Sequence, residues 1–477
     1  MISLLLSDIA RITKGELIGT DCSIEQLGQE RRRYDGQLST DSRSLSKNDV
    51  FLALKGDNFD GHKFSQQAEE AFCAAIIVSE KQDVNIPQIV VHNTRFALGK
   101  IGAYVKAQVA PKTVGITGSS GKTTVKEMTA AILSRLGNVL ATKGNFNNDI
   151  GVPLTLLRLE HQHDYAVIEM GANHIGEISY TSNLVKPDIA VINNIAAAHL
   201  EGFGDLCGVA RAKGEIFEGL PEGGVALYNK DSKYANKWQW RLVDKNVRQF
   251  SCLNKSDCYS SDVVLNDDGC ASFKLNTYKG NAFIQLTVPG NHNVCNAVAA
   301  ATIALEFGAS LDDVRLGLAQ MKPVKGRMNL HHIDDKFKIF DDTYNANVES
   351  IKAAIELLAS FPGRRILILG DMAELGSDAR SYHQDVGMYA KELRIDNLLT
   401  LGVLSQATSD AFDNKPTHFS EKSHLMKYLT EIVADDATQI SMLVKGSRSS
   451  KMELVVQDII QWREAINSHS LNTGESV

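Results

Sequence analysis

The sequence predicts an α/β protein of three domains whose central domain is a doubly wound, mostly parallel sheet. Two observations support this prediction. The chain has 477 residues, and single domains usually contain about 100–200 residues. Short, continuously apolar segments alternate with helical patterns along most of the chain, as they do in parallel sheets whose strands are buried on both faces.

The first domain is predicted to span residues 1–110. Its segments indicate strands at 49–54, 74–79 and 88–92 and helices at 63–72 and 94–108. The opening MISLLLSDIARIT has the pattern of an amphipathic helix. It lacks the basic segment and the small-residue cleavage site of a secretory signal. The polar segment 25–37 suits a loop and indicates no function.

The central domain is predicted to span residues 111–322. Continuous apolar segments indicate parallel strands at 113–117, 165–170, 188–195 and 223–229. From 257 to 289 the pattern changes to alternation around the turns NDDG and YKGN, which predicts a small antiparallel region. A helix is expected at 291–308. The proline-containing segments VAPKT and MKPVKGR mark the two domain boundaries.

The third domain is predicted to span residues 323–477 and to be a Rossmann-like α/β unit. Strands are expected at 336–342, 364–370, 397–402 and 440–447, and a helical pattern follows each of them. This alternation is typical of a parallel sheet with crossover helices.

Composition narrows the class of protein. The formal net charge is −7, which argues against non-specific nucleic-acid binding, since that usually requires a basic excess. The seven cysteines form no CxxC pair, so a disulfide framework or a zinc site is not expected. No apolar segment approaches the ~20 residues of a membrane span. We therefore expect a cytoplasmic protein without membrane insertion.

The segment GITGSSGKTT, residues 115–124, predicts a phosphate site. Gly118 and Gly121 allow a tight turn that points backbone N–H groups at an anion, and the following helix adds its positive end. Lys122 can reach terminal phosphates, and the Thr123 hydroxyl can bind Mg²⁺. The longer GxxxxGK[ST] pattern is not met, because Ile116 stands where its first glycine would be. The loop indicates ATP or GTP but no particular reaction.

Four further side chains are candidates, each with an alternative that the residues alone leave open. Glu169 ends a predicted strand beside the phosphate loop, where it either binds Mg²⁺ or points to solvent. His199 follows the next strand, and it suits a structural or a catalytic role equally well. Lys213, taken alone, has the pattern of a solvated helix lysine. Asp342 ends a strand of the third domain, or it caps the next helix.

A series of longer motifs carries a resemblance to a known family. In order they are TGSSGKTT, NFNNDIGVPLTLL, EMGANHIGEI, AHLEGFG, AKGEIF, GNHNVCNA, GRM, DDTYNAN, LGDMAELG and VKGSRS. The chain resembles the Mur ligases of bacterial cell-wall synthesis over nearly its whole length, from STDSR at residue 39 onward. One departure is Ala197-Ala198 before His199, where the family often has Gly-Pro.

The resemblance implies a UDP-substrate domain, a central ATPase domain and a C-terminal domain that closes over the site. It implies amide formation that is driven by ATP and passes through an acyl phosphate. The motifs EMGANHIGEI and DDTYNANVES imply that D-alanyl-D-alanine is added to UDP-N-acetylmuramoyl-tripeptide for peptidoglycan synthesis. Two Mg²⁺ ions, a carbamylated lysine and a monomeric state are expected. The third peptide residue, diaminopimelate or lysine, stays open.

The resemblance also assigns roles to residues. Catalysis is expected from Lys122, Glu169, His199 and Lys213. The metal ligands are expected to be Thr123, Glu169, His199 and Lys213 as its carbamate. ATP is expected to contact Gly118, Ser119, Ser120, Gly121, Lys122, Thr123, Thr124, Asn293, Arg327 and Asp342. The other substrates are expected to contact Ser42, Arg43, Lys55, Asn147, Asn148, Tyr344 and Asn345.

Two other functions remain open at this point. Another amide ligase of the same fold, such as a different Mur ligase or a folylpolyglutamate synthase, would accept a different amine. A P-loop switch protein would hydrolyse ATP without any amine acceptor. Fold resemblance alone does not decide between acceptors.

Overall fold

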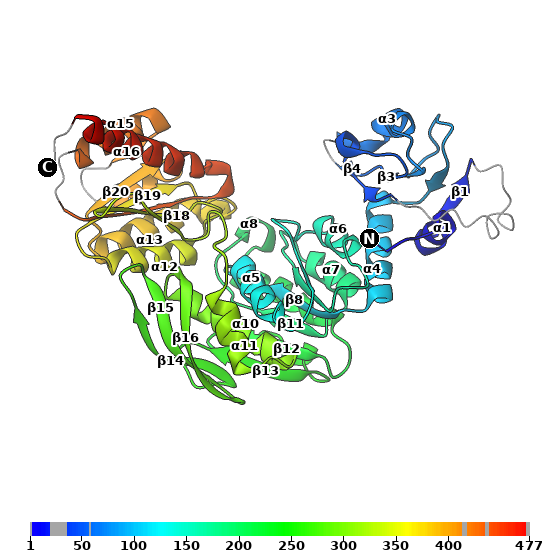
Figure 1. Ribbon diagram of the computed structural model, residues 1–477, viewed down its shortest axis with the longest axis horizontal. Coiled ribbons are helices and arrows are strands. Elements are labelled where there is room, and N and C mark those ends of the chain that lie inside the picture. Colours follow the sequence, from blue (N-terminus) through cyan, green and yellow to red (C-terminus); the bar gives the residue numbers. More distant parts are fainter. Residues whose placement is uncertain (1, 20–35, 57–58, 413–416, 435–437, 474–477) are drawn as a thin grey trace.

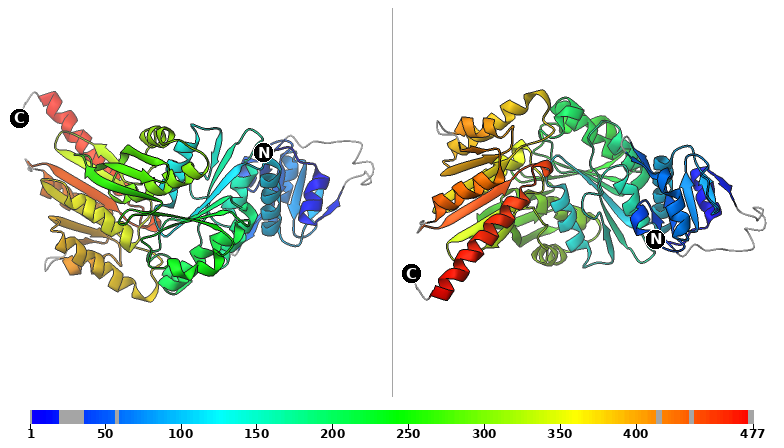
Figure 2. Two further views of the ribbon diagram at one scale, coloured as in Figure 1. Left: turned by 90° about the horizontal axis from the view of Figure 1, so that it is seen from below. Right: turned by 90° about the horizontal axis from the view of Figure 1, so that it is seen from above.

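The structure is a computed structural model that describes residues 2–19, 36–56, 59–412, 417–434 and 438–473. Figure 1 shows three α/β units in a row, with the N-terminal unit in blue at one end and the C-terminal unit in orange and red at the other. The two views of Figure 2 show the same elongated arrangement. The predicted fold class is confirmed. Among the described residues, no helix combines the length and the apolar character that crossing a membrane requires.

The N-terminal unit is built on a five-stranded sheet in the order β1-β7-β6-β3-β2. All its pairs are parallel except β1 with β7. The strands are β1 (Glu16–Ile18), β2 (Leu38–Ser39), β3 (Val50–Leu52), β6 (Ala75–Val78) and β7 (Gln88–Val90); the helices are α1 (Leu6–Thr13), α3 (Ser65–Glu70) and α4 (Thr94–Val109); β4 (Lys55–Gly56) and β5 (Phe59–Asp60) form a separate hairpin. The three predicted strands and the predicted helices are present. Most of the polar segment 25–37 lies outside the described residues.

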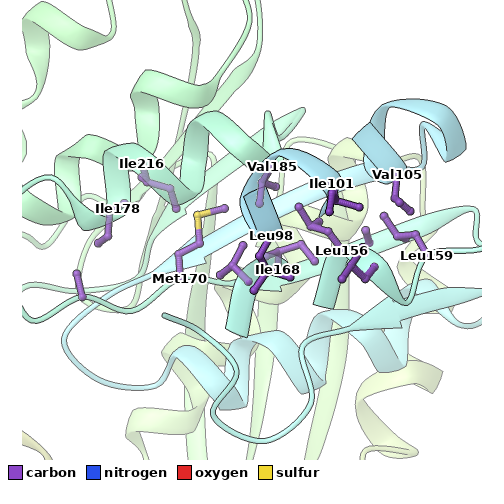
Figure 3. Packing of buried hydrophobic residues seen from close by; sticks show 14 of the residues in the cluster. Leu98, Ile101, Val105, Leu156, Leu159, Ile168, Met170, Ile178, Val185 and Ile216 are labelled. Carbon is purple, nitrogen blue, oxygen red and sulfur yellow. The ribbon is translucent and has the colours of Figure 1, made fainter. Parts of the chain in front are cut away.

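Helix α4 packs against the central unit and connects the N-terminal unit to it. Its apolar side chains Leu98, Ile101 and Val105 are fully buried. Figure 3 shows them packed toward Leu156 and Ile168, which belong to the central unit. Because burial of apolar surface is the dominant favourable term in packing, α4 is the anchor from which the N-terminal sheet extends.

The central unit contains a nine-stranded sheet in the order β16-β15-β14-β13-β12-β11-β8-β10-β9. Pairing is parallel from β9 through β14 and antiparallel from β14 to β16. The strands are β8 (Lys112–Thr117), β9 (Val139–Ala141), β10 (Tyr165–Glu169), β11 (Ile189–Ile192), β12 (Val225–Asn229), β13 (Asn246–Ser251), β14 (Cys258–Leu265), β15 (Cys270–Thr277) and β16 (Gly280–Pro289). The predicted antiparallel region is confirmed. Strands β9 and β13 were not predicted, because β9 has three residues and β13 is polar and exposed at its start.

Helices cover both faces of this sheet, and two separate apolar cores lie beneath them. The helices are α5 (Lys122–Leu133), α6 (Gly151–Leu157), α7 (Glu177–Val185), α8 (Leu200–Phe203), α9 (Leu206–Gly214), α10 (His292–Glu306) and α11 (Leu311–Ala319). From β8 the chain forms β9 and then β10 on one side of β8, and it then crosses to form β11 on the other side. This reversal of strand order at β8 is where doubly wound sheets bind their ligands.

The C-terminal unit has a six-stranded sheet in the order β17-β18-β22-β19-β20-β21, in which only the pair β17 and β18 is antiparallel. The strands are β17 (Asn329–His332), β18 (Phe337–Asp342), β19 (Arg364–Gly370), β20 (Asn397–Leu401), β21 (His418–Phe419) and β22 (Ile440–Lys445); the helices are α12 (Val348–Ala359), α13 (Ala379–Glu392), α14 (Gln406–Phe412), α15 (Lys422–Val433) and α16 (Glu453–Thr473). The four predicted strands are confirmed, and the sheet has the predicted Rossmann-like alternation.

Candidate active site

The phosphate loop joins β8 to α5, as predicted from the sequence. Gly121 precedes α5 with φ of 74°, a left-handed conformation that favours glycine. A side chain there would collide with the amide of Asn296. The loop therefore requires glycine both for its backbone angle and for close packing. The free N–H groups that begin α5 form a site for an anion.

Asparagine side chains fix the shape of this loop. Asn194 accepts a hydrogen bond from the Ser120 N–H at 2.8 Å and donates to the Ser120 hydroxyl at 2.9 Å. Asn193 donates to the Ser120 carbonyl at 3.1 Å and to Asn296 at 2.9 Å. Sequence reasoning assigned no role to these asparagines. The available signal was their position, because Asn193 and Asn194 directly follow β11 at the edge that carries the loop.

Lys122, Thr123 and Glu169 meet at this edge. The strand register pairs Glu169 with Ile116, one residue before the end of β8. Glu169 is 2% exposed. Its carboxylate accepts from the Thr123 hydroxyl at 3.0 Å and from the Asn147 amide at 2.8 Å. The alternative of a solvent-facing carboxylate is therefore wrong.

Lys122 is placed at the centre of the loop. Its ammonium donates to the Gly118 carbonyl at 2.7 Å. Burial, reinforced by the nearby charge of Arg327, lowers its pKa. Two half-buried cations, Lys122 and Arg327, beside the free N–H groups at the start of α5 create a local positive field in a protein of negative net charge. This field matches the terminal phosphates of a nucleotide.

A cavity of about 640 Å³ lies over the loop and extends to the C-terminal unit. Both units line it. Predicted site residues in its lining are Ser119, Ser120, Gly121, Lys122, Thr123, Thr124, His199, Asn293, Arg327, Asp342 and Asn345. The structure thus brings together most of the residues that the sequence assigned to ATP. The cavity's volume lies within the usual range for small-molecule sites.

The C-terminal unit contributes Arg327 and Asp342 to the lining of the cavity. The Arg327 guanidinium lies 3.4 Å from the Thr123 hydroxyl and stacks 4.1 Å from the centre of the Tyr344 ring. Asp342 accepts from the buried Lys445 ammonium at 2.6 Å. The cap of α12 is Asn347, so the alternative of Asp342 as that cap is wrong.

Buried polar atoms around the cavity are left for a ligand to satisfy. In the described part of the chain, Arg327 Nε, His292 Nδ1 and Asn193 Oδ1 are buried without a hydrogen-bond partner. Buried polar atoms are normally paired, since an unpaired one costs about 1–3 kcal/mol. All three residues line the cavity. Their arrangement favours a polar ligand there.

His199 lies at the start of α8, facing the C-terminal unit. Its Nδ1 is 2.5 Å from Glu374 Oε2. The imidazole lowers the pKa of the Glu374 carboxyl. Glu374 lies within the motif LGDMAELG, yet sequence reasoning gave this glutamate no role.

Lys213 is fully buried on α9, at 0% exposure. The alternative of a solvated helix lysine is therefore wrong. Its Nζ has no hydrogen-bond partner and lies 5.5 Å from the centre of the Phe203 ring. Burial, together with the positive charge of Lys122, lowers its pKa well below 10.5. Such an environment favours the neutral, nucleophilic form of the amine over the ammonium.

The remaining predicted substrate residues lie elsewhere. Ser42, Arg43 and Lys55 belong to the N-terminal unit and do not line the cavity; Arg43 pairs with Asp41 at 2.8 Å. Asn148 accepts from the Gly151 N–H at 2.8 Å, at the start of α6. None of these residues lines the cavity over the phosphate loop.

The donor set near the loop fits Mg²⁺ in the presence of a nucleotide. Among the described residues, no group of three or more histidine, cysteine, aspartate or glutamate side chains is placed to hold a metal ion. Mg²⁺ usually binds through one or two protein oxygens plus substrate phosphates and waters. The Thr123 hydroxyl and the Glu169 carboxylate, 3.0 Å apart beside the loop, meet that requirement.

Models of the Mur ligase family match most of the chain. The model described as Mur ligase family, catalytic domain matches residues 37–112. The Mur ligase middle domain matches 116–304, and the Mur ligase, glutamate ligase domain matches 326–448.

Individual relatives match over nearly the full length. The UDP-N-acetylmuramoyl-tripeptide–D-alanyl-D-alanine ligase of Escherichia coli (strain K12) is 46% identical over 96% of this chain and 98% of its own. The crystal structure of MurF from Acinetobacter baumannii is 36% identical, with a TM-score of 0.89 over 96% of this chain and 99% of that one. MurF ligase from Thermotoga maritima, in complex with ADP, is 27% identical, with a TM-score of 0.82 over 90% and 98%.

Proposed function

The chain belongs to the Mur ligase family, and we propose that it joins D-alanyl-D-alanine to UDP-N-acetylmuramoyl-tripeptide at the expense of ATP. The observation that carries this proposal is the cavity over the phosphate loop, where Lys122 and Thr123 meet Arg327 of another unit. The full-length relatives are ligases of this name, which favours this acceptor over those of other amide ligases. A P-loop switch protein has no comparable support.

We propose domain boundaries near residues 110 and 322, with a UDP-substrate domain, an ATPase domain and a closing domain. The first boundary falls between α4 and β8, and the second falls between α11 and β17. Ser42, Arg43 and Lys55 would then bind the UDP-sugar on the first domain. Asn147 and Asn148 would line the path of the peptide, together with Tyr344 and Asn345 on the third domain.

ATP is proposed to bind with its phosphates on residues 118–124. The N–H groups of the loop and the Lys122 ammonium would neutralise the β- and γ-phosphates. Asn293, Arg327 and Asp342, which line the same cavity, would hold the rest of the nucleotide. Binding would also pair the orphaned Nε of Arg327, whose guanidinium can form a bidentate contact with phosphate.

Thr123, Glu169 and His199 would hold Mg²⁺, and Lys213 would join them as a carbamate. A plain ammonium has only donors. Addition of CO₂ to the neutral Lys213 amine gives an anionic carbamate and releases one proton. The burial of Lys213 and the absence of a hydrogen-bond partner for its Nζ lower the pKa of this amine, which favours the uncharged form that the addition requires. When bound, the ions would supply charge neutralisation for the reacting anions.

The reaction has two steps. First, an oxygen of the peptide carboxylate attacks the γ-phosphorus, ADP leaves, and an acyl phosphate forms. Then the neutral amine of D-alanyl-D-alanine attacks the acyl carbon, and inorganic phosphate leaves with that oxygen. Lys122 and Arg327 would stabilise the charge on the transferring phosphoryl group. The amine must lose its proton, and His199, which lines the cavity, could accept it if it does not hold Mg²⁺.

Oxygen transfer tests the function directly. With ¹⁸O in the terminal carboxylate of the UDP-tripeptide, we expect one labelled oxygen per molecule of inorganic phosphate released. Mass spectrometry of the phosphate measures it, and the nucleotide product should contain no label. Unlabelled phosphate would contradict the acyl phosphate. Phosphate release that proceeds without D-alanyl-D-alanine at the same rate would favour the switch protein.

Substrate binding is expected to compact the molecule. The C-terminal unit already contacts the phosphate loop, but the N-terminal unit lies at the far end of the central one (Figure 1). A UDP-substrate that extends from the first domain to the loop would draw the units together, and closure of the C-terminal unit would exclude water from the acyl phosphate. Small-angle scattering should show a smaller radius of gyration with UDP-tripeptide and a non-hydrolysable ATP analogue. An unchanged radius would contradict closure.

A further inference from the structure

We propose that Arg448 binds the carboxylate of the incoming amine substrate and thereby selects a peptide with a free carboxyl end. This inference rests on the proposed function, because it takes D-alanyl-D-alanine as the amine substrate. The amino group of this dipeptide must reach the acyl phosphate, and its other end is a carboxylate at neutral pH. That carboxylate needs a cation which the phosphates of ATP do not already occupy.

The lysine and arginine side chains of the cavity differ in how far they are available. Among the described residues, those that line the cavity are Lys122, Arg327, Lys445 and Arg448. Lys122 and Arg327 lie at the phosphate loop, where the nucleotide phosphates are proposed to bind. Lys445 is 2% exposed, and its ammonium donates to Asp342 at 2.6 Å and to the Asn345 carbonyl at 2.9 Å. Arg448 is therefore the cation that remains available to a second anionic ligand.

The backbone that carries Arg448 is fixed at the edge of the C-terminal sheet. Arg448 follows β22, whose carboxyl end lies between those of β18 and β19, and ligands of open α/β sheets bind at that edge. The preceding Ser447 is buried. Its N–H donates to the Asp371 carbonyl at 2.9 Å, and its hydroxyl oxygen accepts from the Ala373 N–H at 2.7 Å. These bonds join the loop after β22 to the loop after β19 and fix the point from which the Arg448 side chain extends.

The guanidinium itself is accessible to a ligand. The Arg448 side chain is 66% exposed, and its Nη1 lies 3.0 Å from Oε1 of Glu453 in the first turn of α16. Exposed ion pairs contribute little free energy, so Glu453 orients the side chain without keeping it from a substrate. A guanidinium has five N–H groups in a planar fork. A second carboxylate can bind through the N–H groups that Glu453 does not use.

Acidic side chains around the cavity make the place of the carboxylate specific. Glu349 and Glu374 also line the cavity. Because like charges repel, the carboxylate of the dipeptide is disfavoured near these two residues and favoured beside Arg448. Arg448 belongs to the C-terminal unit, and the phosphate loop belongs to the central one. A dipeptide that is held by Arg448 at its carboxylate can therefore extend its amino end across the cavity toward the loop.

A neutral analogue of the substrate tests this assignment. D-alanyl-D-alaninamide replaces the carboxylate by an uncharged amide of nearly the same size, so the ratio of kcat/KM for the dipeptide to kcat/KM for its amide measures recognition of the charge. Wild type should prefer the carboxylate about 10–100-fold, as expected for hydrogen bonds to a charged group. In Arg448→Ala this preference should disappear, because only the reaction of the carboxylate loses a partner. A general disturbance of the fold would lower both values and leave their ratio unchanged.

Two further variants separate the charge of Arg448 from its packing. Arg448→Lys keeps a cation but loses the planar fork, so it should retain part of the preference for the carboxylate. Arg380→Ala is the matched control, because Arg380 is an exposed arginine on α13 of the same unit and does not line the cavity. It should keep the wild-type ratio. The KM for ATP should be unchanged in all three variants.

The outcomes separate this inference from the proposed function. If wild type forms no product with D-alanyl-D-alanine, the proposed function is wrong, and the role of Arg448 is wrong with it. If wild type is active and Arg448→Ala keeps the preference for the carboxylate, the function stands and the role of Arg448 is wrong. A higher KM for ATP in Arg448→Ala with an unchanged ratio would place this arginine in nucleotide binding instead. An equal loss of preference in Arg380→Ala would also overturn the inference.

Discussion

Replacement of Lys213 by alanine is expected to lower kcat about 1000-fold without unfolding the protein. The Nζ of Lys213 is fully buried and has no hydrogen-bond partner, so its removal breaks no hydrogen bond of the fold. What it removes is the only group on α9 that can become an anionic ligand by addition of CO₂. Loss of one group that stabilises charge in a buried site typically costs 10²–10³-fold in rate. Steady-state phosphate release in the presence of all three substrates measures the loss.

Chemical rescue separates this role from packing. A short carboxylic acid that enters the cavity left by Lys213→Ala should restore part of the rate, whereas a neutral amide of the same size should not. Arg211→Ala is the matched control, because Arg211 is an exposed cation two residues earlier on the same helix. It should retain wild-type activity. Wild-type activity in Lys213→Ala would show that no carbamate at this position is needed for the reaction.

Lys213 is also expected to lower the free energy of unfolding. Its pKa in the folded state lies well below its ordinary value of 10.5. Between those two pKa values the unfolded chain binds more protons than the folded one, so the free energy of unfolding decreases as pH falls through this window. We expect Lys213→Met to raise the free energy of unfolding by about 1–3 kcal/mol at neutral pH and to flatten this dependence. Urea denaturation in CO₂-free buffer with EDTA measures it.

The environment of Lys213 shows where sequence reasoning reaches its limit. On a short helix of mixed composition, a lysine has no local signal of burial, and it was identified only through resemblance to a family. Glu169 was easier to predict. It is a carboxylate at the end of an apolar strand beside a phosphate loop, and few roles fit that position. Glu374 lies in one of the motifs that carry the resemblance, but no local signal paired it with His199, which is far away in the sequence and belongs to another unit.

The fold was predictable to the extent that its strands were continuous apolar segments. Strands β8, β10, β11 and β12 are buried along nearly their whole length, and each was predicted within one to three residues of its ends. Strand β13 was not, because its first residues are exposed and polar. Strand β13 forms because it pairs with β12 and β14. Such pairing depends on the tertiary structure and cannot be seen in a local sequence pattern.

Replacement of Lys122 by alanine is expected to lower kcat/KM for ATP by at least about 1000-fold. Lys122 is the first residue of α5, so its ammonium lies where the phosphates, the free N–H groups and the helix end converge. As the bond to ADP breaks, negative charge spreads over the γ-phosphoryl oxygens. This cation stabilises that charge in the transition state more than it stabilises the bound ATP. The effect should therefore fall mainly on kcat, and titration calorimetry should show a smaller loss in affinity for ADP.

Lys126 offers a matched control on the same helix. It lies one turn after Lys122, is buried, and donates to the Thr142 carbonyl at 2.7 Å instead of facing the loop. Lys126→Met should lower the free energy of unfolding, since it leaves that carbonyl unpaired, while ADP affinity is retained. Lys122→Arg should not restore the rate, because a planar guanidinium cannot replace a compact ammonium beside Gly118. Equal kinetic losses at Lys122 and Lys126 would mean that the helix as a whole is disturbed, and that Lys122 has no special part in phosphoryl transfer.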